Sequence, residues 1–138
     1  MKAHENLLVF YKKQPTYNPQ KTSGHKRKTA INVDRAKKQS ECYGTQEGIT
    51  HYDSTVRYPR SVLKLSTDKQ KSTLHPTQKP VSLCEYMILT YTDEGQTVLD
   101  NCMGSGSTGV AAKNLNRRFI GIEKDEAYFK IASERIGV

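Results

Sequence analysis

Residues 100–109 read Asp-Asn-Cys-Met-Gly-Ser-Gly-Ser-Thr-Gly, and this glycine-rich stretch decides the fold of the second half of the chain. The residues 97–99 precede it as a predicted strand, and residues 110–115 carry apolar side chains at helical spacing. Glycines allow a backbone to approach a ligand closely, and the first turn of a helix presents N–H groups without intrahelical partners. The stretch therefore predicts a ligand-binding turn between a strand and a helix.

Glu123 strengthens this prediction, because it stands 19 residues after Gly104 at the end of the predicted strand 118–122. A carboxylate at that place in a nucleotide-binding unit accepts hydrogen bonds from ribose hydroxyls. The glycines from Gly104 to Gly109 also fit the GxGxxG pattern of dinucleotide-binding proteins, so the class of ligand stays open. The Gly-Lys-Ser/Thr ending of a nucleoside triphosphate loop is missing. The two features together predict a cofactor that carries a nucleoside.

Two further helices flank this unit. Pro80 is predicted at the start of the first, with Ser82 as a possible cap and apolar residues at helical spacing up to Tyr91. Asp125 is predicted to cap the last helix, which extends to Ile136. The order helix, strand, helix, strand, helix predicts an α/β fold, part of a Rossmann-like doubly wound sheet with a loop-rich basic insertion.

The first half of the chain is less regular. Residues 7–11, Leu-Leu-Val-Phe-Tyr, predict a buried strand, and residues 61–65 predict a second short strand. Between them the sequence has no persistent period. We therefore expect a strand within residues 1–15, a loop-rich basic segment over 16–74 and an α/β unit over 75–138.

The net charge of +8 lies in the first half of the chain. Residues 1–74 hold 15 Lys and Arg against 6 Asp and Glu, whereas residues 75–138 hold 7 against 8. This asymmetry predicts a phosphate-binding surface, with an ordinary basic surface as the alternative. The three cysteines lack metal or disulfide spacing, and no apolar run has membrane-spanning length. We therefore expect no metal site, no membrane span and a cytoplasmic location.

Three motifs occur in order and carry a resemblance to a known family. They are His-Pro-Thr-Gln-Lys-Pro at 75–80, the glycine-rich stretch from Asp100, and Phe-Ile-Gly-Ile-Glu at 119–123. Together they resemble the C-terminal half of permuted, S-adenosylmethionine-dependent DNA methyltransferases that modify exocyclic amino groups, adenine N6 or cytosine N4. The resemblance covers residues 57–138 strongly, and residues 4–11 also resemble a strand of that family's sheet.

The resemblance implies an S-adenosylmethionine site. Lys79 and Pro80 would border the methionine part of the cofactor, Asp100 would contact its amino end, and Glu123 would bind its ribose. The family also implies a lining of backbone and hydroxyl groups from Gly104, Ser105, Gly106, Ser107 and Thr108. One departure is visible, because Asn-Cys follows Asp100 where the family usually has Pro-Phe. His75 is expected to be a structural loop residue rather than a catalyst.

The resemblance also places contacts with double-stranded DNA in the basic segment. The candidate contacts are Lys26, Arg27, Lys28, Arg57 and Arg60. A basic loop that is simply solvated is the alternative for the cluster at 25–28.

The motif that holds the target amino group in this family, Asp or Asn followed by Pro-Pro and an aromatic residue, is absent from these residues. The nearest string is Asn18-Pro19-Gln20. We therefore expect an N-terminally truncated chain without catalytic residues, active only if a separate chain supplies the catalytic half, with adenine N6 favoured over cytosine N4 as the acceptor. The alternatives are a non-catalytic DNA-binding remnant and, from GxGxxG alone, an NAD-binding oxidoreductase domain.

Overall fold

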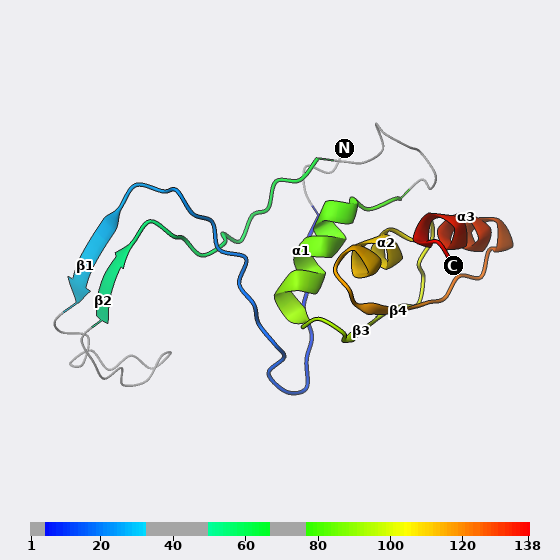
Figure 1. The fold of residues 1–138 in the computed structure, drawn as a ribbon, viewed down its shortest axis with the longest axis horizontal. Helices are drawn as coiled ribbons and strands as arrows, with labels where there is room; N and C mark the ends of the chain where they lie inside the picture. The colour runs from blue at the N-terminus through cyan, green and yellow to red at the C-terminus, as the bar shows by residue number, and fades with distance from the viewer. Residues whose placement is uncertain (1–4, 33–49, 67–76) are drawn as a thin grey trace. The chain divides into compact units, whose positions relative to one another are not determined.

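The computed structural model describes residues 5–32, 50–66 and 77–138 (Figure 1). The chain divides into two compact units. The α/β unit comprises Met1–Asn18 and Val62–Val138, and the hairpin unit comprises Pro19–Ser61.

Five elements follow one another in the α/β unit. They are α1 (Val81–Tyr91), β3 (Thr97–Asp100), α2 (Ser107–Asn114), β4 (Arg118–Gly121) and α3 (Glu126–Ile136). Strands β3 and β4 are parallel, with a register that runs from Thr97 opposite Arg118 to Asp100 opposite Gly121. The predicted order of helices and strands is confirmed, and the unit is part of a doubly wound α/β fold.

The predicted helix starts are confirmed at two positions. Pro80 caps α1 in an extended conformation, and its carbonyl oxygen accepts from the N–H groups of Leu83 and Cys84. Ser82 lies inside α1, so the prediction that it caps the helix was wrong. At α3, one carboxylate oxygen of Asp125 accepts from the backbone N–H groups at positions 127 and 128, at 2.9 and 3.0 Å.

The core of the α/β unit lies on both sides of α2, which is positioned between α1 and α3 (Figure 1). Ala111 and Ala112 of α2 are fully buried against Ile88 of α1. On the other side, α3 packs its residue Ala132 against the loop that precedes α2. Phe119 of β4 packs against both clusters and joins them into one core.

Alternate residues of β3 and β4 point to opposite faces of the sheet. Val98 and Phe119 pack on the core, whereas Leu99 and Ile120 are 63% and 54% exposed. Among the described residues, the helices therefore cover one face of this two-stranded sheet and leave an apolar opposite face.

The hairpin unit contains two antiparallel strands, β1 (Lys28–Asn32) and β2 (Thr50–Ser54). Lys28 pairs with Ser54, and an isolated bridge between Thr22 and Arg57 extends the ribbon at its base. Neither strand was predicted, because this part of the sequence has no clear alternation of apolar and polar residues.

Two other predicted strands are not formed. Residues 7–11 have no regular structure and are exposed, with Phe10 at 86%, and residues 61–65 are likewise irregular and exposed. A strand is stable only when its backbone pairs with a neighbour, and neither segment has a strand partner among the described residues. The predictions of strands at 7–11, buried, and at 61–65 were therefore wrong for this chain.

Candidate functional site

The candidate site lies where the parallel strands of the α/β unit end. The carboxyl ends of adjacent parallel strands meet at one edge of a sheet, so Asp100 at the end of β3 and Glu123 just after β4 lie at the same edge. The loop from Asp100 to α2 connects them, because the N–H of Gly104 donates to Oε2 of Glu123 at 2.8 Å. The structure thus brings the two predicted acids and the glycine-rich loop together.

Glu123 is held by backbone groups. Its Oε1 accepts from the N–H groups of Asp125 and Lys124 at 3.0 and 2.9 Å, while its Oε2 accepts from Gly104. These N–H groups, first that of Asp125 and then that of Gly104, lower the pKa of Glu123 below its ordinary value because they stabilise the charged form. The side chain is therefore a fixed carboxylate at neutral pH.

Asp100 is positioned by α2. Its Oδ2 accepts from the Thr108 hydroxyl at 2.6 Å, and its Oδ1 accepts from the Cys102 N–H at 3.1 Å. The Thr108 hydroxyl also lies 3.9 Å from the Cys84 thiol, whose pKa is raised chiefly by burial. Thr108 therefore orients Asp100, while Cys84 is a neutral packing residue of α1.

The loop glycines are explained by packing as well as by ligand access. Gly106 has φ 77°, and a Cβ there would lie 3.0 Å from the Cβ of Ala132. At Gly109 a Cβ would lie 2.3 Å from Cδ1 of Ile136, so α2 could not pack so closely on α3 with any larger residue. The predicted reason for these glycines, close approach to a ligand, is thus joined by a second one, close approach to α3.

Ser105 and Ser107 are buried, at 3% and 7% exposure. Arg135 of α3 donates from Nη1 to the carbonyl oxygen of Ser105 and, at 3.0 Å, to its Oγ. The Oγ of Ser107 forms no hydrogen bond with the described residues. Arg135 was not among the predicted site residues, although its spacing from Ala132 and Ile136 places all three on one face of α3.

The predicted residues before α1 lie at the start of that helix. Lys79 is exposed and forms an ion pair with Glu5, with Nζ 2.6 Å from Oε2, and Pro80 caps α1. Gln78 is buried. The first two residues of the predicted motif, at 75 and 76, lie outside the described residues.

Asn18, the first residue of the nearest string to the missing motif, has a structural role. Its backbone N–H donates to the carbonyl oxygen of Thr90 at 2.7 Å, and its side-chain amide donates to Asp93 at 3.1 Å. These bonds attach residues 5–18 to the end of α1, just as Glu5 attaches them near its start. The Asn18 amide is thus occupied by the α/β unit itself.

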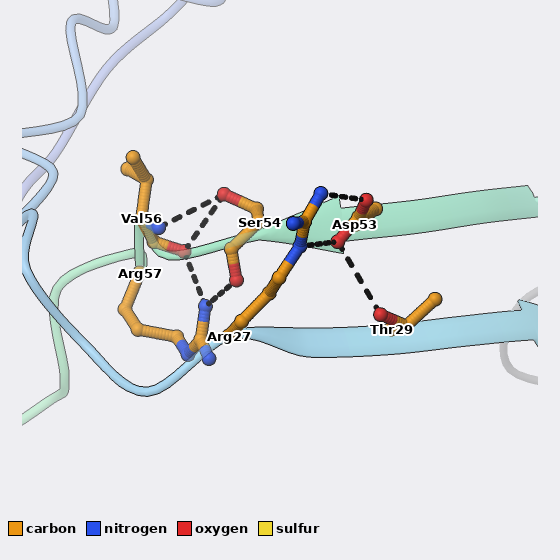
Figure 2. A network of polar contacts seen from close by, with 6 residues as sticks. All are labelled: Arg27, Thr29, Asp53, Ser54, Val56 and Arg57. Carbon is orange, nitrogen blue, oxygen red and sulfur yellow. Dashed lines mark hydrogen bonds and ion pairs between the residues drawn. The ribbon is translucent and has the colours of Figure 1, made fainter.

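In the hairpin unit, two of the predicted DNA contacts stabilise the ribbon. The guanidinium of Arg27 donates to both carboxylate oxygens of Asp53, at 2.7 and 2.6 Å, and this charge-assisted pairing lowers the pKa of Asp53 (Figure 2). Thr29 adds a third bond to the same carboxylate at 3.3 Å. Both Arg27 and Asp53 are exposed, so solvent and salt screen the pair.

Arg57 lies beside an irregular part of the ribbon and donates hydrogen bonds to its backbone. Between the pairs 22–57 and 28–54, residues 23–27 face only residues 55–56, so a bulge interrupts the ladder. Arg57 donates to the carbonyl oxygens of Lys26, Ser54 and Val56 at 2.6, 2.8 and 2.8 Å (Figure 2 shows the last two). Its guanidinium thus satisfies carbonyl groups that surround the bulge. Lys26, Lys28 and Arg60, in contrast, are exposed.

Comparison with known protein families shows which family the chain belongs to. The family model described as DNA methylase, for N6 and N4 methyltransferases, matches residues 1–134. The chain belongs to this DNA methylase family. It is also similar to the type II methyltransferase M2.DpnII of Streptococcus pneumoniae, with 56% identity over 62 residues, 45% of this chain and 23% of that protein.

Two longer matches agree with this assignment. The type II methyltransferase M.HpaI of Haemophilus parainfluenzae is 32% identical over 133 residues, 96% of this chain and 38% of that protein. The solved PvuII DNA methyltransferase, named cytosine-N4-specific, superposes with a TM-score of 0.50 at 26% identity, covering 56% of this chain and 31% of that one. The chain therefore spans well under half the length of these DNA methylases. The match leaves the oxidoreductase alternative without support.

DNA methylases of this family use S-adenosylmethionine. The polar groups at the loop fit such a ligand, because they combine two oriented carboxylate acceptors with a buried serine hydroxyl. A buried polar atom without a partner costs about 1–3 kcal/mol, so the Ser107 hydroxyl would be stabilised by a polar atom of a ligand.

The described residues contain no group of three or more His, Cys, Asp or Glu side chains arranged to hold a metal ion. Cys84 and Cys102 are free thiols, and the third cysteine lies outside the described residues. None of the helices in the described ranges has the length and hydrophobicity of a membrane-spanning segment.

Proposed function

We propose that this chain provides the S-adenosylmethionine-binding part of a DNA amino-methyltransferase. The observation that carries the proposal is the meeting of Asp100, Glu123 and the loop at the ends of β3 and β4, joined by the bond from Gly104 to Glu123. Ligands of open α/β sheets bind at the carboxyl ends of the strands, which is where these groups lie. When bound, S-adenosylmethionine supplies the methyl group.

The two carboxylates have distinct roles in this proposal. Oε1 of Glu123 already accepts two N–H groups, whereas Oε2 accepts one, so Oε2 keeps acceptor capacity for a ribose hydroxyl. Asp100 is a negative charge held in place by Thr108, which suits the amino end of the cofactor. Gly104, Ser105, Gly106, Ser107 and Thr108 line the ligand, and Lys79 and Pro80 border its methionine part.

Calorimetry tests the cofactor assignment. We expect S-adenosylhomocysteine to bind and NAD not to bind. Glu123→Gln should weaken binding about tenfold, because loss of a charge-assisted hydrogen bond costs on the order of 1.4 kcal/mol. Glu126→Gln is the matched control, since Glu126 is an exposed acid in the first turn of α3. Preferential binding of NAD, or equal losses in the two variants, would contradict the assignment.

We further propose that the hairpin unit contacts the phosphates of double-stranded DNA through Lys26, Lys28 and Arg60. Their support is exposure without a side-chain hydrogen bond or ion pair to other described residues, whereas Arg27 and Arg57 stabilise the ribbon. Replacing Lys26 and Lys28 together by glutamine should lower the slope of log affinity against log salt by about 2, one unit for each phosphate contact. An unchanged slope would refute the contact.

The Lys26 and Lys28 experiment needs a control for net charge. Lys124 and Lys130 of the α/β unit are exposed, and replacing both by glutamine also removes two positive charges. We expect this control to reduce the slope less than the hairpin variant does. Equal reductions would indicate a general charge effect rather than contacts at the hairpin.

We propose that these 138 residues alone do not transfer a methyl group. No Asp or Asn followed by Pro-Pro and an aromatic residue occurs in them, and Asn18 is engaged at the end of α1. A separate polypeptide segment with that motif would supply the acceptor-binding groups. Incubation with tritiated S-adenosylmethionine and DNA should give no product, and robust methylation by the isolated chain would disprove this point.

For the methyl acceptor we propose adenine N6 rather than cytosine N4. The solved relative with a TM-score of 0.50 is named cytosine-N4-specific, so the two acceptors must be separated by experiment. Mass spectrometry of nucleosides from DNA methylated by the complemented enzyme identifies the product. N6-methyladenine supports the proposal, and N4-methylcytosine overturns it. Salt-dependent DNA retention without methylation under any complementation would favour the non-catalytic alternative.

A further inference from the structure

We propose that Arg135 is a positioning residue for the cofactor loop. This inference rests on the proposed function, because it assigns Arg135 the task of holding the loop in its ligand-binding conformation. Arg135 lies in the last turn of α3, 30 residues from the serine that it contacts, and none of the motifs discussed above contains it.

The contact is made to both polar groups of one buried residue. Nη1 of Arg135 donates to the carbonyl oxygen of Ser105 and to its Oγ, the latter at 3.0 Å. Ser105 is 3% exposed, so its carbonyl group would otherwise have little access to water. Hydrogen bonds from a charged donor are roughly twice as strong as those between neutral groups. Both hydrogen bonds that the Arg135 side chain forms with the described residues go to Ser105, so this loop is its principal partner.

This bond determines the orientation of a peptide unit at the centre of the loop. The carbonyl of Ser105 and the N–H of Gly106 belong to the same peptide, whose N–H donates to the carbonyl oxygen of Met103 at 2.8 Å. Gly106, with φ 77°, has no Cβ to restrict rotation of that peptide. Arg135 and the carbonyl group of Met103 therefore hold the two ends of a peptide that Gly106 would otherwise allow to turn. Its orientation decides whether an N–H or a carbonyl group faces a given side of the loop.

The rest of α3 supports the same loop from the same face. Ala132, Arg135 and Ile136 are spaced so that they share one face of the helix. A Cβ added at Gly106 would lie 3.0 Å from the Cβ of Ala132 and 3.2 Å from Cδ1 of Ile136. The apolar pair thus sets how close the loop lies to α3, and Arg135 sets which way its peptide points.

Lys113 offers a matched comparison. It lies on α2, and its Nζ donates to the carbonyl oxygen of Ile136 at 2.5 Å. Lys113 and Arg135 therefore each form a charge-assisted bond between the region of α2 and that of α3. Only Arg135 contacts the loop, so only its removal should affect ligand binding beyond a general loss of stability.

The experiment compares Arg135→Met, Arg135→Lys and Lys113→Met in the full chain. We expect Arg135→Met to raise the dissociation constant for S-adenosylhomocysteine about tenfold, the equivalent of about 1.4 kcal/mol. Lys113→Met should change it by less than about twofold at a comparable loss of unfolding free energy. Arg135→Lys should recover most of the affinity, because both bonds come from a single nitrogen that an ammonium group can replace.

Hydrogen exchange in the absence of ligand provides a second measurement. The amides of residues 104–108 should exchange faster in Arg135→Met than in Lys113→Met. An unchanged affinity in Arg135→Met, or equal affinity losses in the two Met variants, would overturn the inference. Failure of the unsubstituted chain to bind S-adenosylhomocysteine would instead overturn the proposed function, and the exchange comparison would still decide whether Arg135 holds the loop. Should Arg135→Met not fold, Arg135→Gln takes its place, because a neutral amide cannot form the charge-assisted bonds. Faster exchange of residues 104–108 in Arg135→Gln than in Lys113→Met would support the inference, and equal or slower exchange would refute it.

Discussion

Replacing Gly106 by alanine should destabilise the chain more than the same replacement at Gly95. The two glycines have nearly the same φ, 77° and 79°. They differ in surroundings, because a Cβ at Gly95 would have no atom within 4 Å, whereas one at Gly106 would contact Ala132 and Ile136. Comparing the two alanine variants therefore separates the free-energy cost of a left-handed backbone, which both share, from the cost of packing, which only Gly106→Ala has.

The magnitude follows from those distances. Left-handed backbone costs a residue with a Cβ about 1–2 kcal/mol, and this cost applies to both positions. The gain from a less flexible unfolded chain also applies to both, so it cancels in the difference. At Gly106 the new Cβ would lie 3.0 and 3.1 Å from Cβ and Cα of Ala132, below the roughly 3.5–4.0 Å that carbon pairs prefer. Overpacking of this kind costs about 1–3 kcal/mol, so Gly106→Ala should lose about 1 kcal/mol more than Gly95→Ala.

Urea unfolding followed by circular dichroism gives the two free energies. A double-mutant cycle with Ala132→Gly adds a direct test, because contacting positions couple by about 0.5 kcal/mol or more. Equal losses at Gly106 and Gly95, together with no coupling to Ala132, would show that α3 does not confine the loop. The packing explanation of Gly106 would then be wrong, and ligand access would be the remaining reason for a glycine there.

Three other changes give distinct outcomes. Backbone N–H groups lower the pKa of Glu123, so the contribution of this carboxylate to stability is present at neutral pH and is lost as the pH falls below 4.5 through the lowered pKa. Glu123→Gln should remove this acid dependence, as measured by unfolding at several pH values. Phe119→Ala should lower the free energy of unfolding by about 2 kcal/mol or more, whereas Leu99→Ser on the exposed sheet face should change it by less than about 0.5 kcal/mol. Similar losses in the two variants would contradict the assignment of Phe119 and Leu99 to opposite faces. Arg57→Ala should accelerate amide exchange in residues 22–30 without affecting exchange in α2, because the carbonyl groups of Lys26, Ser54 and Val56 to which it donates lie in the hairpin unit.

The helices and strands of residues 80–136 could be predicted because their signals are local. Pro80 and Asp125 stand directly before the helices that they cap, and the glycine-rich loop adjoins both the strand and the helix that it connects. The meeting of Asp100 with Glu123 also followed from general geometry, since parallel neighbouring strands end at one edge. These features require no knowledge of distant contacts.

The apolar run at residues 7–11 shows where local signals are insufficient. Its composition is typical of a buried strand, yet Phe10 is 86% exposed and the backbone is irregular. Hydrophobic composition favours burial only when a neighbouring surface exists to bury against, and strand conformation requires a paired backbone. Residues 97–99 have a similar composition and do form β3, because β4 pairs with them.

The roles of the basic residues could not be separated from the sequence for a related reason. Arg27, Lys28 and Arg57 are equivalent as charges, and all three were predicted to contact DNA. Their roles depend on the register of the ribbon, in which residues 23–27 face only residues 55–56. That bulge places backbone carbonyl groups around Arg57, whereas Lys28 lies in β1 and is exposed. A cation that saturates crowded carbonyl groups has few donors left for phosphate. Under the proposed function, the register, rather than the number of positive charges, therefore determines which side chains of this hairpin would be available to DNA.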